Sequence, residues 1–284
     1  MKLTMLKGIP ASGKSTFARQ TVKESGNSAR INRDDLRAML FESVWTGKRE
    51  EVVIACEKAI AEVLFKHGMN PVIDDTNLSQ RHRDMWSSFA REREQSFVTR
   101  DMGVDIGTCI ERDRNRPNGV GRAVIDRMAL QNGMIEWGDK PIILCDIDGT
   151  LANGDHRVHF VQGEKKDWDS YYSLLEHDSP IDAVVRWVRE LHKDHTVCIV
   201  SGRPDTYQRK TMKWLDDNEI PYDWIFMRPG SDKRPDVQVK GDFLKHLPKG
   251  QIDFAIDDRP CVIREVWRAN GVRVIPVCGE CEDF

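Results

Sequence analysis

The sequence has 284 residues, of which 39 % are hydrophobic and 31 % are charged. This length fits about two domains of ordinary size, and the composition is that of a soluble globular chain rather than a disordered or fibrous one. No apolar run approaches the ~20 residues that a membrane-spanning helix needs. The N-terminus leads straight into a predicted strand and leaves no room for a signal peptide, so we expect a cytoplasmic protein without membrane contact.

The formal net charge is only −3, and it is unevenly divided along the chain. Residues 1–138 hold 22 basic and 19 acidic residues, whereas the remainder holds 21 and 27. A nucleic-acid site would therefore have to be a local basic groove rather than a general positive field. Seven cysteines, several of them in apolar strands, indicate reduced thiols in an intracellular protein. Cys278 and Cys281 form a lone C-x-x-C that lacks two further metal ligands nearby.

Strand and helix patterns alternate through the first half of the chain. The expected strands are Leu3–Leu6, Ala29–Ile31, Pro71–Asp74 and Ser96–Val98. The expected helices are Lys14–Lys23, Asp34–Phe41, Glu50–Lys66 and Arg81–Glu94. This alternation predicts an α/β domain with a mostly parallel sheet flanked by helices.

A run of turn-forming residues at Trp137–Pro141 separates the halves, so we predict domains at residues 1–138 and 139–284. Further strands are expected at residues 142–145, 196–200, 224–227, 254–256 and 272–277. Ser179 and Pro180 are predicted to cap and begin a helix. The second half is therefore a second α/β domain of the same general kind.

A complete G-x-x-x-x-G-K-S pattern, Gly8 to Ser15, lies between the first strand and the first helix. Backbone N–H groups in such a loop converge on phosphates, Lys14 reaches the β- and γ-phosphates, and Ser15 holds Mg²⁺. We therefore predict an ATP site. Its members are Gly8, Ser12, Gly13, Lys14, Ser15 and Thr16.

Two acidic segments follow strands of the first half, at the sheet edge where ligands bind. In Asn32-Arg33-Asp34-Asp35-Leu36-Arg37, a carboxylate could accept the proton of an attacking hydroxyl, and Arg37 could bind an anionic acceptor. In Asp74-Asp75-Thr76-Asn77, a carboxylate could arrange the acceptor or a metal-bound water. In both segments the competing interpretation is a carboxylate that only caps a helix, and in the first segment Arg37 would then be its i,i+3 partner.

The stretch from Arg112 to Arg122 is rich in arginine and contains Pro and Gly. Arginines in a loop that closes over ATP can stabilise the transferred phosphoryl group. The competing interpretation is a solvated helical face, and the composition favours the loop. From the residues alone, either Arg114 or Arg116 could be the arginine that contacts ATP.

In the second half, the strand at 142–145 runs into Asp146-Ile-Asp148-Gly-Thr150. Alternation along a strand places both carboxylates on one side, so one could attack phosphorus while the other handles a proton. A calcium loop would need Gly at its sixth position and Glu at its twelfth, where this sequence has Leu151 and Arg157. Calcium binding is therefore rejected.

Three later segments of the second half complete a phosphate-handling set. Ser201-Gly202-Arg203 follows a strand and could bind phosphate, Lys240 lies in a polar stretch, and Asp257-Asp258 ends a strand with carboxylates suited to Mg²⁺. This ordered set resembles the haloacid dehalogenase phosphohydrolase superfamily. The resemblance implies Asp146 as nucleophile and Asp148 as general acid/base. It also implies phosphoryl binding by Ser201 and Lys240, and metal binding by Asp146, Asp148, Asp257 and Asp258.

Taken together, the motifs and their order over nearly all 284 residues resemble the phage-type polynucleotide 5′-kinase/3′-phosphatase family. The resemblance implies a P-loop kinase fold followed by a haloacid-dehalogenase-like fold, ATP and Mg²⁺ as cofactors, and homo-oligomers. Further roles follow from it: Asp34 as general base, Arg37 and Asp75 at the acceptor, Arg116 on ATP, and Arg157, Arg203 and Asp236 in the phosphatase site.

The resemblance implies an enzyme that heals DNA or RNA ends for ligation. It would phosphorylate 5′-hydroxyl ends and remove 3′-phosphates, with the opening of a 2′,3′-cyclic phosphate as an additional candidate reaction. One alternative is a kinase fused to a phosphatase that both act on a metabolite or nucleoside. Another is a non-catalytic nucleic-acid-binding protein, against which the intact Lys14, Ser15, Asp146 and Asp148 argue.

Overall fold

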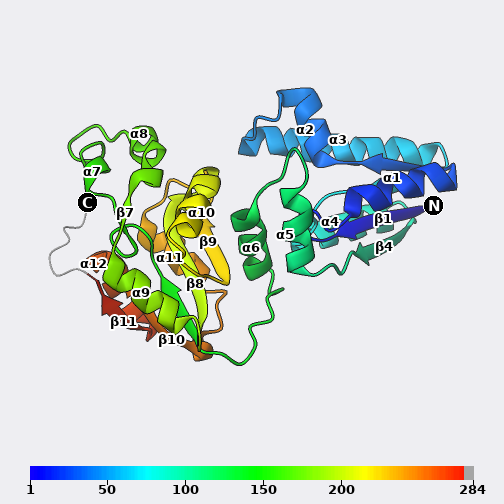
Figure 1. Ribbon diagram of the computed structural model, residues 1–284. Coiled ribbons are helices and arrows are strands. Elements are labelled where there is room, and N and C mark those ends of the chain that lie inside the picture. Colours follow the sequence, from blue (N-terminus) through cyan, green and yellow to red (C-terminus); the bar gives the residue numbers. More distant parts are fainter. Residues whose placement is uncertain (278–284) are drawn as a thin grey trace. The chain divides into compact units, whose positions relative to one another are not determined.

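The computed structural model describes residues 1–277 and divides into two compact units, residues 1–118 and 119–284 (Figure 1). Each unit is built on its own parallel sheet, which confirms the predicted α/β class. Among the described residues, no helix is both long enough and apolar enough to cross a bilayer.

Unit 1 contains four parallel strands in the order β2-β3-β1-β4. The strands are β1 (Lys2–Lys7), β2 (Ser28–Ile31), β3 (Asn70–Ile73) and β4 (Ser96–Asp101). The helices are α1 (Lys14–Ser25), α2 (Arg33–Phe41), α3 (Gly47–Lys66), α4 (Gln80–Arg91) and α5 (Ile106–Arg114).

The central strand β1 has helices on both of its faces. Because side chains alternate along a strand, Leu3 and Met5 join a core that includes Trp86 of α4. Leu6 points the other way and packs against Ala18 of α1. The loops that follow β1, β2 and β3 all leave the sheet at its carboxyl edge, which brings the three predicted kinase segments together.

Unit 2 contains five parallel strands in the order β11-β10-β5-β8-β9 and a small antiparallel pair. The main strands are β5 (Ile142–Cys145), β8 (Thr196–Pro204), β9 (Trp224–Arg228), β10 (Ile252–Asp257) and β11 (Arg273–Pro276). The pair is β6 (Ala152–Asn153) and β7 (Ser179–Pro180). The helices are α6 (Arg122–Gln131), α7 (Asp155–Val158), α8 (Trp168–Ser173), α9 (Asp182–Leu191), α10 (Gln208–Asp217), α11 (Asp236–Leu244) and α12 (Pro260–Val262).

Every residue of β5 is buried, because helices cover both faces of this sheet. Ile143 contributes to a core with Val188 of α9 and Trp214 of α10. On the opposite face Phe226 of β9 packs against Phe243 of α11, with ring centroids 6.1 Å apart. Such continuous burial explains the uninterrupted apolar run that ends in Asp146.

The contact boundary between the units precedes the boundary expected at 138/139, because α6 packs on the sheet of unit 2. Asp126 of α6 accepts a hydrogen bond from the backbone N–H of Ile225 at 3.1 Å. Gln208 accepts one from the backbone N–H of Ala123 at 3.0 Å. The turn-forming run that begins at Trp137 therefore follows the change of contacts, and the domain boundary at 138/139 stays a prediction.

The helix expected to begin at Ser179-Pro180 begins at Asp182 instead, and that prediction was wrong. Ser179 and Pro180 form β7 and pair antiparallel with Asn153 and Ala152 of β6. A capping residue followed by proline is a local signal for a helix start. The strand β6, with which these residues pair, lies more than 20 residues earlier in the chain, so a tertiary contact decided their conformation.

Candidate active sites

The phosphate loop of unit 1 is preformed around the side chain of Lys14. Its ammonium group donates to the carbonyl oxygens of Gly8 at 2.9 Å and Ile9 at 2.8 Å. Gly13 caps α1 with φ 92°, a left-handed conformation that favours glycine. A Cβ at Gly8 would meet Ser12 Oγ at 2.5 Å, so the loop closes only with glycine there. Burial lowers the pKa of Lys14.

A buried carboxylate, Asp74, lies beside the hydroxyl of Ser15. Burial raises the pKa of Asp74, and hydrogen bonds from Arg30 and Ser15 partly offset the rise. Arg30 Nε lies 2.5 Å from Asp74 Oδ2. In P-loop enzymes a hydroxyl of the phosphate loop and a carboxylate at a strand end hold Mg²⁺, and Ser15 and Asp74 offer these two kinds of ligand. The resemblance had implied an acceptor role for the neighbouring Asp75.

Asp34 and Arg37 lie at the exposed start of α2. The Asp34 side chain is 85 % exposed and pairs with Arg37, its expected i,i+3 partner. The helix cap is Asn32, whose side chain accepts from the N–H of Asp35 at 2.9 Å, so Asp34 is not needed as a cap. Arg37 is also held by Glu50 of α3, with guanidinium–carboxylate contacts of 2.9–3.1 Å.

Asp75 connects the end of β3 to the start of α2. Its Oδ1 accepts a hydrogen bond from the backbone N–H of Arg33 at 2.9 Å. It does not cap the next helix, α4, where Ser79 has that role. Glu57 of α3 is fully buried and bonds the Arg33 guanidinium at 2.8 Å. Burial and the nearby negative charge of Asp75 raise the pKa of Glu57 to about 9, so this cluster retains a proton at neutral pH.

The arginine-rich stretch is partly helical. Arg112 and Arg114 belong to the last turn of α5, and Arg116 follows the helix. Arg116 is tethered by Asp113, with Nε 2.8 Å from the carboxylate. Burial is the main cause of the lowered pKa of Lys14, and the positive charge of Arg116 adds to it. Arg116 therefore lies near enough to Lys14 for its charge to act there, and its role as the arginine that contacts ATP stays a prediction.

In unit 2 the predicted carboxylates converge on one buried lysine. Lys240 of α11 lies 3.0 Å from Asp146, 2.8 Å from Asp257 and 3.5 Å from Asp236. Burial lowers the pKa of Lys240, but these three carboxylates more than offset it, and the pKa is raised well above the ordinary value. Burial also raises the pKa of Asp146, with Lys240 opposing the rise. Lys240 therefore holds the proposed nucleophile in place.

The residues present fit a divalent metal ion. Within residues 1–277, Asp146, Asp257 and Asp258 form a group whose ligand oxygens all lie within 4.8 Å of one another. Carboxylate oxygens are ligands that Mg²⁺ prefers. Asp148, which the resemblance also assigned to the metal, is not in this group, because its carboxylate is turned toward two arginines.

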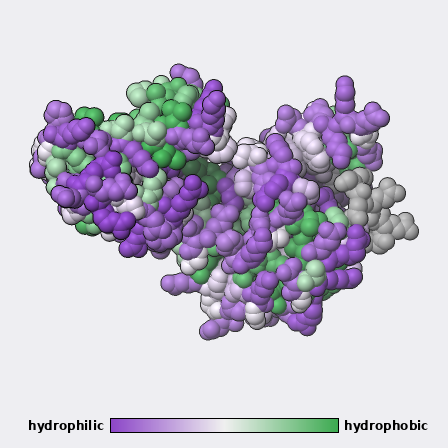
Figure 2. Space-filling view, turned by 180° about the vertical axis from the view of Figure 1, so that it is seen from behind, coloured by the Kyte–Doolittle hydropathy of each residue, from purple (hydrophilic) through white to green (hydrophobic). Residues whose placement is uncertain are grey.

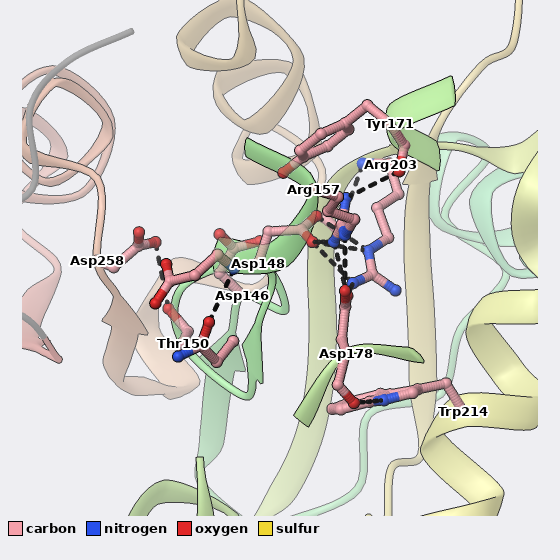
Figure 3. Close-up of polar contacts among 12 residues, drawn as sticks. Asp146, Asp148, Thr150, Arg157, Tyr171, Asp178, Arg203, Trp214 and Asp258 are labelled. Carbon is pink, nitrogen blue, oxygen red and sulfur yellow. Dashed lines mark hydrogen bonds and ion pairs between the residues drawn. The ribbon is translucent and has the colours of Figure 1, made fainter. Parts of the chain in front are cut away.

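Asp148 is held by Arg157 and Arg203, and both arginines are held in turn by Asp178 (Figure 3). Arg157 lies 2.5 Å and Arg203 2.7 Å from Asp148 Oδ1. Burial raises the pKa of Asp148, but the charges of Arg203 and Arg157 outweigh it, and the pKa is well below the ordinary value. Trp214 fixes Asp178 from below by donating its indole N–H to the Asp178 carbonyl at 2.8 Å (Figure 3).

Ser201, Gly202 and Asp236 complete the wall of the site. Ser201 is fully buried, and its hydroxyl accepts from the N–H of Arg203 at 3.2 Å. A Cβ at Gly202 would lie 2.3 Å from the Asp236 carboxylate, so only glycine allows this approach. Asp236 also faces Arg228 at 3.4 Å. The structure thus brings together every phosphatase residue that the sequence singled out.

A pocket of about 390 Å³ opens onto Asp146 and Asp148. Its lining includes both aromatic and basic side chains. The aromatic ones are Trp168, Tyr171 and Tyr172, and the basic ones are Arg228, Lys233, Arg234 and Arg259. A phosphate ester can enter here and reach the nucleophile.

Several residues that position these groups were missed from the sequence. Asp178 and Glu50 lie in no motif, and only the fold brings them to Arg157 and Arg37.

Cys278 and Cys281 lie outside the described residues. Within the described part of the chain, Cys56, Cys109, Cys145 and Cys198 are free cysteines.

Comparisons with known families agree with the two sites. Residues 140–280 match the family described as "Polynucleotide kinase PNKP phosphatase domain". Residues 3–131 match the family described as "AAA domain". These matches confirm the resemblance predicted from the motifs.

Two proteins and one solved structure illustrate what the chain is similar to. The chain is 28 % identical over 312 residues to a protein of Autographa californica nuclear polyhedrosis virus, named "Putative bifunctional polynucleotide kinase/RNA ligase". The alignment covers all of this chain but 43 % of that protein, so the chain spans less than half of its length. An "L-seryl-tRNA(Sec) kinase" of Methanococcus maripaludis is 21 % identical, with 87 % of this chain and 98 % of that protein covered. A chain in the "Structure of Pnkp1/Rnl/Hen1 complex" is 25 % identical with a TM-score of 0.42, covering 97 % of this chain and 96 % of that one.

Proposed function

Because residues 140–280 belong to the polynucleotide kinase phosphatase domain family and residues 3–131 to the AAA domain family, we propose that this chain heals nucleic-acid ends. Unit 1 transfers the γ-phosphoryl group of ATP to a 5′-hydroxyl end. Unit 2 removes a 3′-phosphate. The two products, a 5′-phosphate and a 3′-hydroxyl, are the ends that a ligase joins.

The observation that carries the proposal is that each unit has its own set of phosphate-handling groups. In unit 1 these groups follow β1, β2 and β3, and in unit 2 they surround Asp146 and Lys240. A single composite site would not need both a phosphate loop and a carboxylate nucleophile.

In the kinase reaction, Lys14 leaves the carbonyls of Gly8 and Ile9 and binds the ATP phosphates instead. Asp34 accepts the proton of the 5′-hydroxyl, whose oxygen attacks the γ-phosphorus and releases ADP. Arg37 binds the first phosphate of the acceptor strand, and Arg116 balances the charge on the transferred group. Mg²⁺ would be held by Ser15 and Asp74.

In the phosphatase reaction, an oxygen of Asp146 attacks phosphorus, and the bond to the 3′-oxygen breaks as that oxygen takes a proton from Asp148. Water then attacks the acyl phosphate, gives a proton to Asp148, and releases inorganic phosphate. Asp146, Asp257 and Asp258 would hold Mg²⁺, which would offset the repulsion between carboxylate and phosphate.

The arginine pair explains how one carboxylate can serve both as acid and as base. Without substrate, Arg157 and Arg203 hold Asp148 in its charged form. A bound phosphate competes for the same guanidiniums and weakens their hold, so the pKa of Asp148 rises toward that of a proton donor.

The proposal is tested with end-labelled oligonucleotides. Wild type should phosphorylate a 5′-hydroxyl oligonucleotide far better than a free nucleoside, and should release phosphate from a 3′-phosphate end. Matched DNA and RNA ends, and a 2′,3′-cyclic phosphate end, define the preferred substrate. Equal use of the nucleoside would instead support a metabolite kinase.

Two single substitutions test whether the activities are separate. Lys14→Ala should abolish end phosphorylation and leave 3′-phosphate removal near wild type. Asp146→Asn should do the reverse, because an amide is a far poorer nucleophile than a carboxylate. Loss of both activities in a folded Lys14→Ala protein would refute the two-site model.

We also propose that the protein is cytoplasmic and forms homo-oligomers. The exposed apolar side chains of unit 1 support self-association, and Figure 2 shows an apolar area where α2 and α3 lie. These side chains include Met39, Leu40, Val44 and Val52. Sedimentation of wild type and Val44→Asp tests the idea, since a charge in a self-association surface should shift the protein toward the monomer.

A further inference from the structure

The segment between β6 and β7 places an aromatic cluster over the phosphatase pocket. Trp168 and Tyr172 stack with centroids 5.8 Å apart and an interplanar angle of 22°. Tyr207 extends the cluster, with its ring 5.3 Å from that of Tyr172. None of these residues belongs to the phosphate-handling set.

The aromatic cluster lines the pocket and is not fully buried in the hydrophobic core. Trp168 remains 45 % exposed, although exposure of such a large indole is unfavourable in water. Trp168, Tyr171 and Tyr172 all line the pocket that ends at Asp146. Lys166 lies 5.8 Å from the Trp168 ring. The aromatic surface is therefore next to the point where a phosphate ester would be attacked.

The pocket also offers a positive charge. Lys233 lines it, is exposed, and has no carboxylate within 4.0 Å among residues 1–277. By contrast, the neighbouring Arg234 is paired with Asp232 at 2.7 Å. An aromatic surface and an unpaired cation in the same pocket are the combination that binds single-stranded nucleic acid, where bases stack on the rings and lysine or arginine contacts the backbone.

We propose that Trp168, with Tyr171 and Tyr172, forms a subsite that stacks the base of the 3′-terminal nucleotide, and that Lys233 contacts the adjoining phosphodiester. This inference rests on the proposed 3′-phosphatase function and specifies the substrate of that site. A base bound in this way is unpaired, so the subsite selects single-stranded or frayed 3′ ends over closed duplex ends.

The test compares three substrates: a 3′-phosphate oligonucleotide, the same oligonucleotide ending in an abasic 3′-phosphate, and a small aliphatic phosphate monoester. Trp168→Ala should lower kcat/KM on the first by about five- to a hundredfold, mostly through KM. It should leave the other two nearly unchanged, because neither offers a base. Trp168→Phe should restore much of the loss. Lys233→Ala should lower kcat/KM for both oligonucleotides and leave kcat/KM for the monoester unchanged.

Trp45→Ala is the matched control, since it removes an exposed tryptophan from the other unit and should not affect phosphatase activity. Equal losses on all three substrates would show a structural role for Trp168 and overturn the subsite. An unchanged kcat/KM on the oligonucleotide would also overturn it. Wild type that hydrolyses the monoester but not the oligonucleotide end would instead overturn the proposed function together with the subsite.

Discussion

Asp178 binds Arg157 through both carboxylate oxygens, with Nε and one terminal nitrogen each at 2.6 Å. The same carboxylate receives Arg203 at 2.7 Å. Asp178 itself is buried and touches neither the nucleophile nor the metal-ligand group. Asp178 is therefore a positioning residue: it holds the guanidinium groups of Arg157 and Arg203 where they contact Asp148.

Asp178→Asn should lower 3′-phosphatase kcat/KM at least tenfold and leave kinase activity unchanged. The amide would turn N–H donors toward guanidinium donors, and a charged hydrogen bond of this kind contributes about 1.5–3 kcal/mol. The pH dependence of kcat should also change, because Asp148 would be held differently. Asp217→Asn, at an exposed ion pair of the same unit, is the control. Wild-type phosphatase activity in Asp178→Asn would contradict this role.

Arg37→Ala should reduce kinase kcat/KM for an oligonucleotide acceptor by about ten- to 150-fold, with little change in KM for ATP. Glu50→Gln should produce a smaller loss on the same substrate, because Glu50 fixes the Arg37 guanidinium. The neighbouring Glu51→Gln should be neutral, since that residue is exposed. Steady-state kinetics with varied acceptor and varied ATP separate the effects. A raised KM for ATP in Arg37→Ala would place this arginine at the nucleotide instead.

Arg116→Ala should lower kinase kcat by about a thousandfold or more, in the range seen for arginines that neutralise a transferred phosphoryl group. Arg114→Ala should have a much smaller effect, because the prediction assigns contact with ATP to Arg116. Single-turnover phosphorylation with labelled ATP measures both variants. The reverse order of losses would assign the role to Arg114.

Asp126 should make the stability of unit 2 depend on pH. Burial raises the pKa of Asp126 from 3.8 to about 6, with Arg122 opposing the rise. The folded state therefore keeps a proton that the unfolded state has lost, and the free energy of unfolding falls as pH rises from about 4 to about 6. Above pH 6 the full cost of the buried charge is present, up to about 3 kcal/mol.

Asp126→Asn removes this titration. Relative to wild type, the variant should gain stability as pH rises from 4 to 7, whatever its absolute stability. Urea unfolding monitored by tryptophan fluorescence at several pH values measures the difference. Parallel stability curves for the two proteins would show that Asp126 does not titrate in this range.

Much of both sites could be predicted from the sequence because their key residues directly follow strands. Gly8 to Ser15 follows β1, and Asp146 and Asp148 follow β5, so a local pattern fixes both the chemistry and the place on the sheet. The parallel sheets themselves follow from the alternation of apolar strands with helices.

Only the tertiary structure decided which groups hold those residues and what bounds the pockets. Asp178 reaches Arg203, Glu50 reaches Arg37, and Trp168 reaches the pocket of Asp146 through contacts between distant segments. Ser179-Pro180 became a strand for the same reason. The local sequence determines which chemical groups stand at the end of each strand. The residues that hold those groups come from distant segments, and they meet them only after burial of apolar side chains has packed the helices and strands of each unit together.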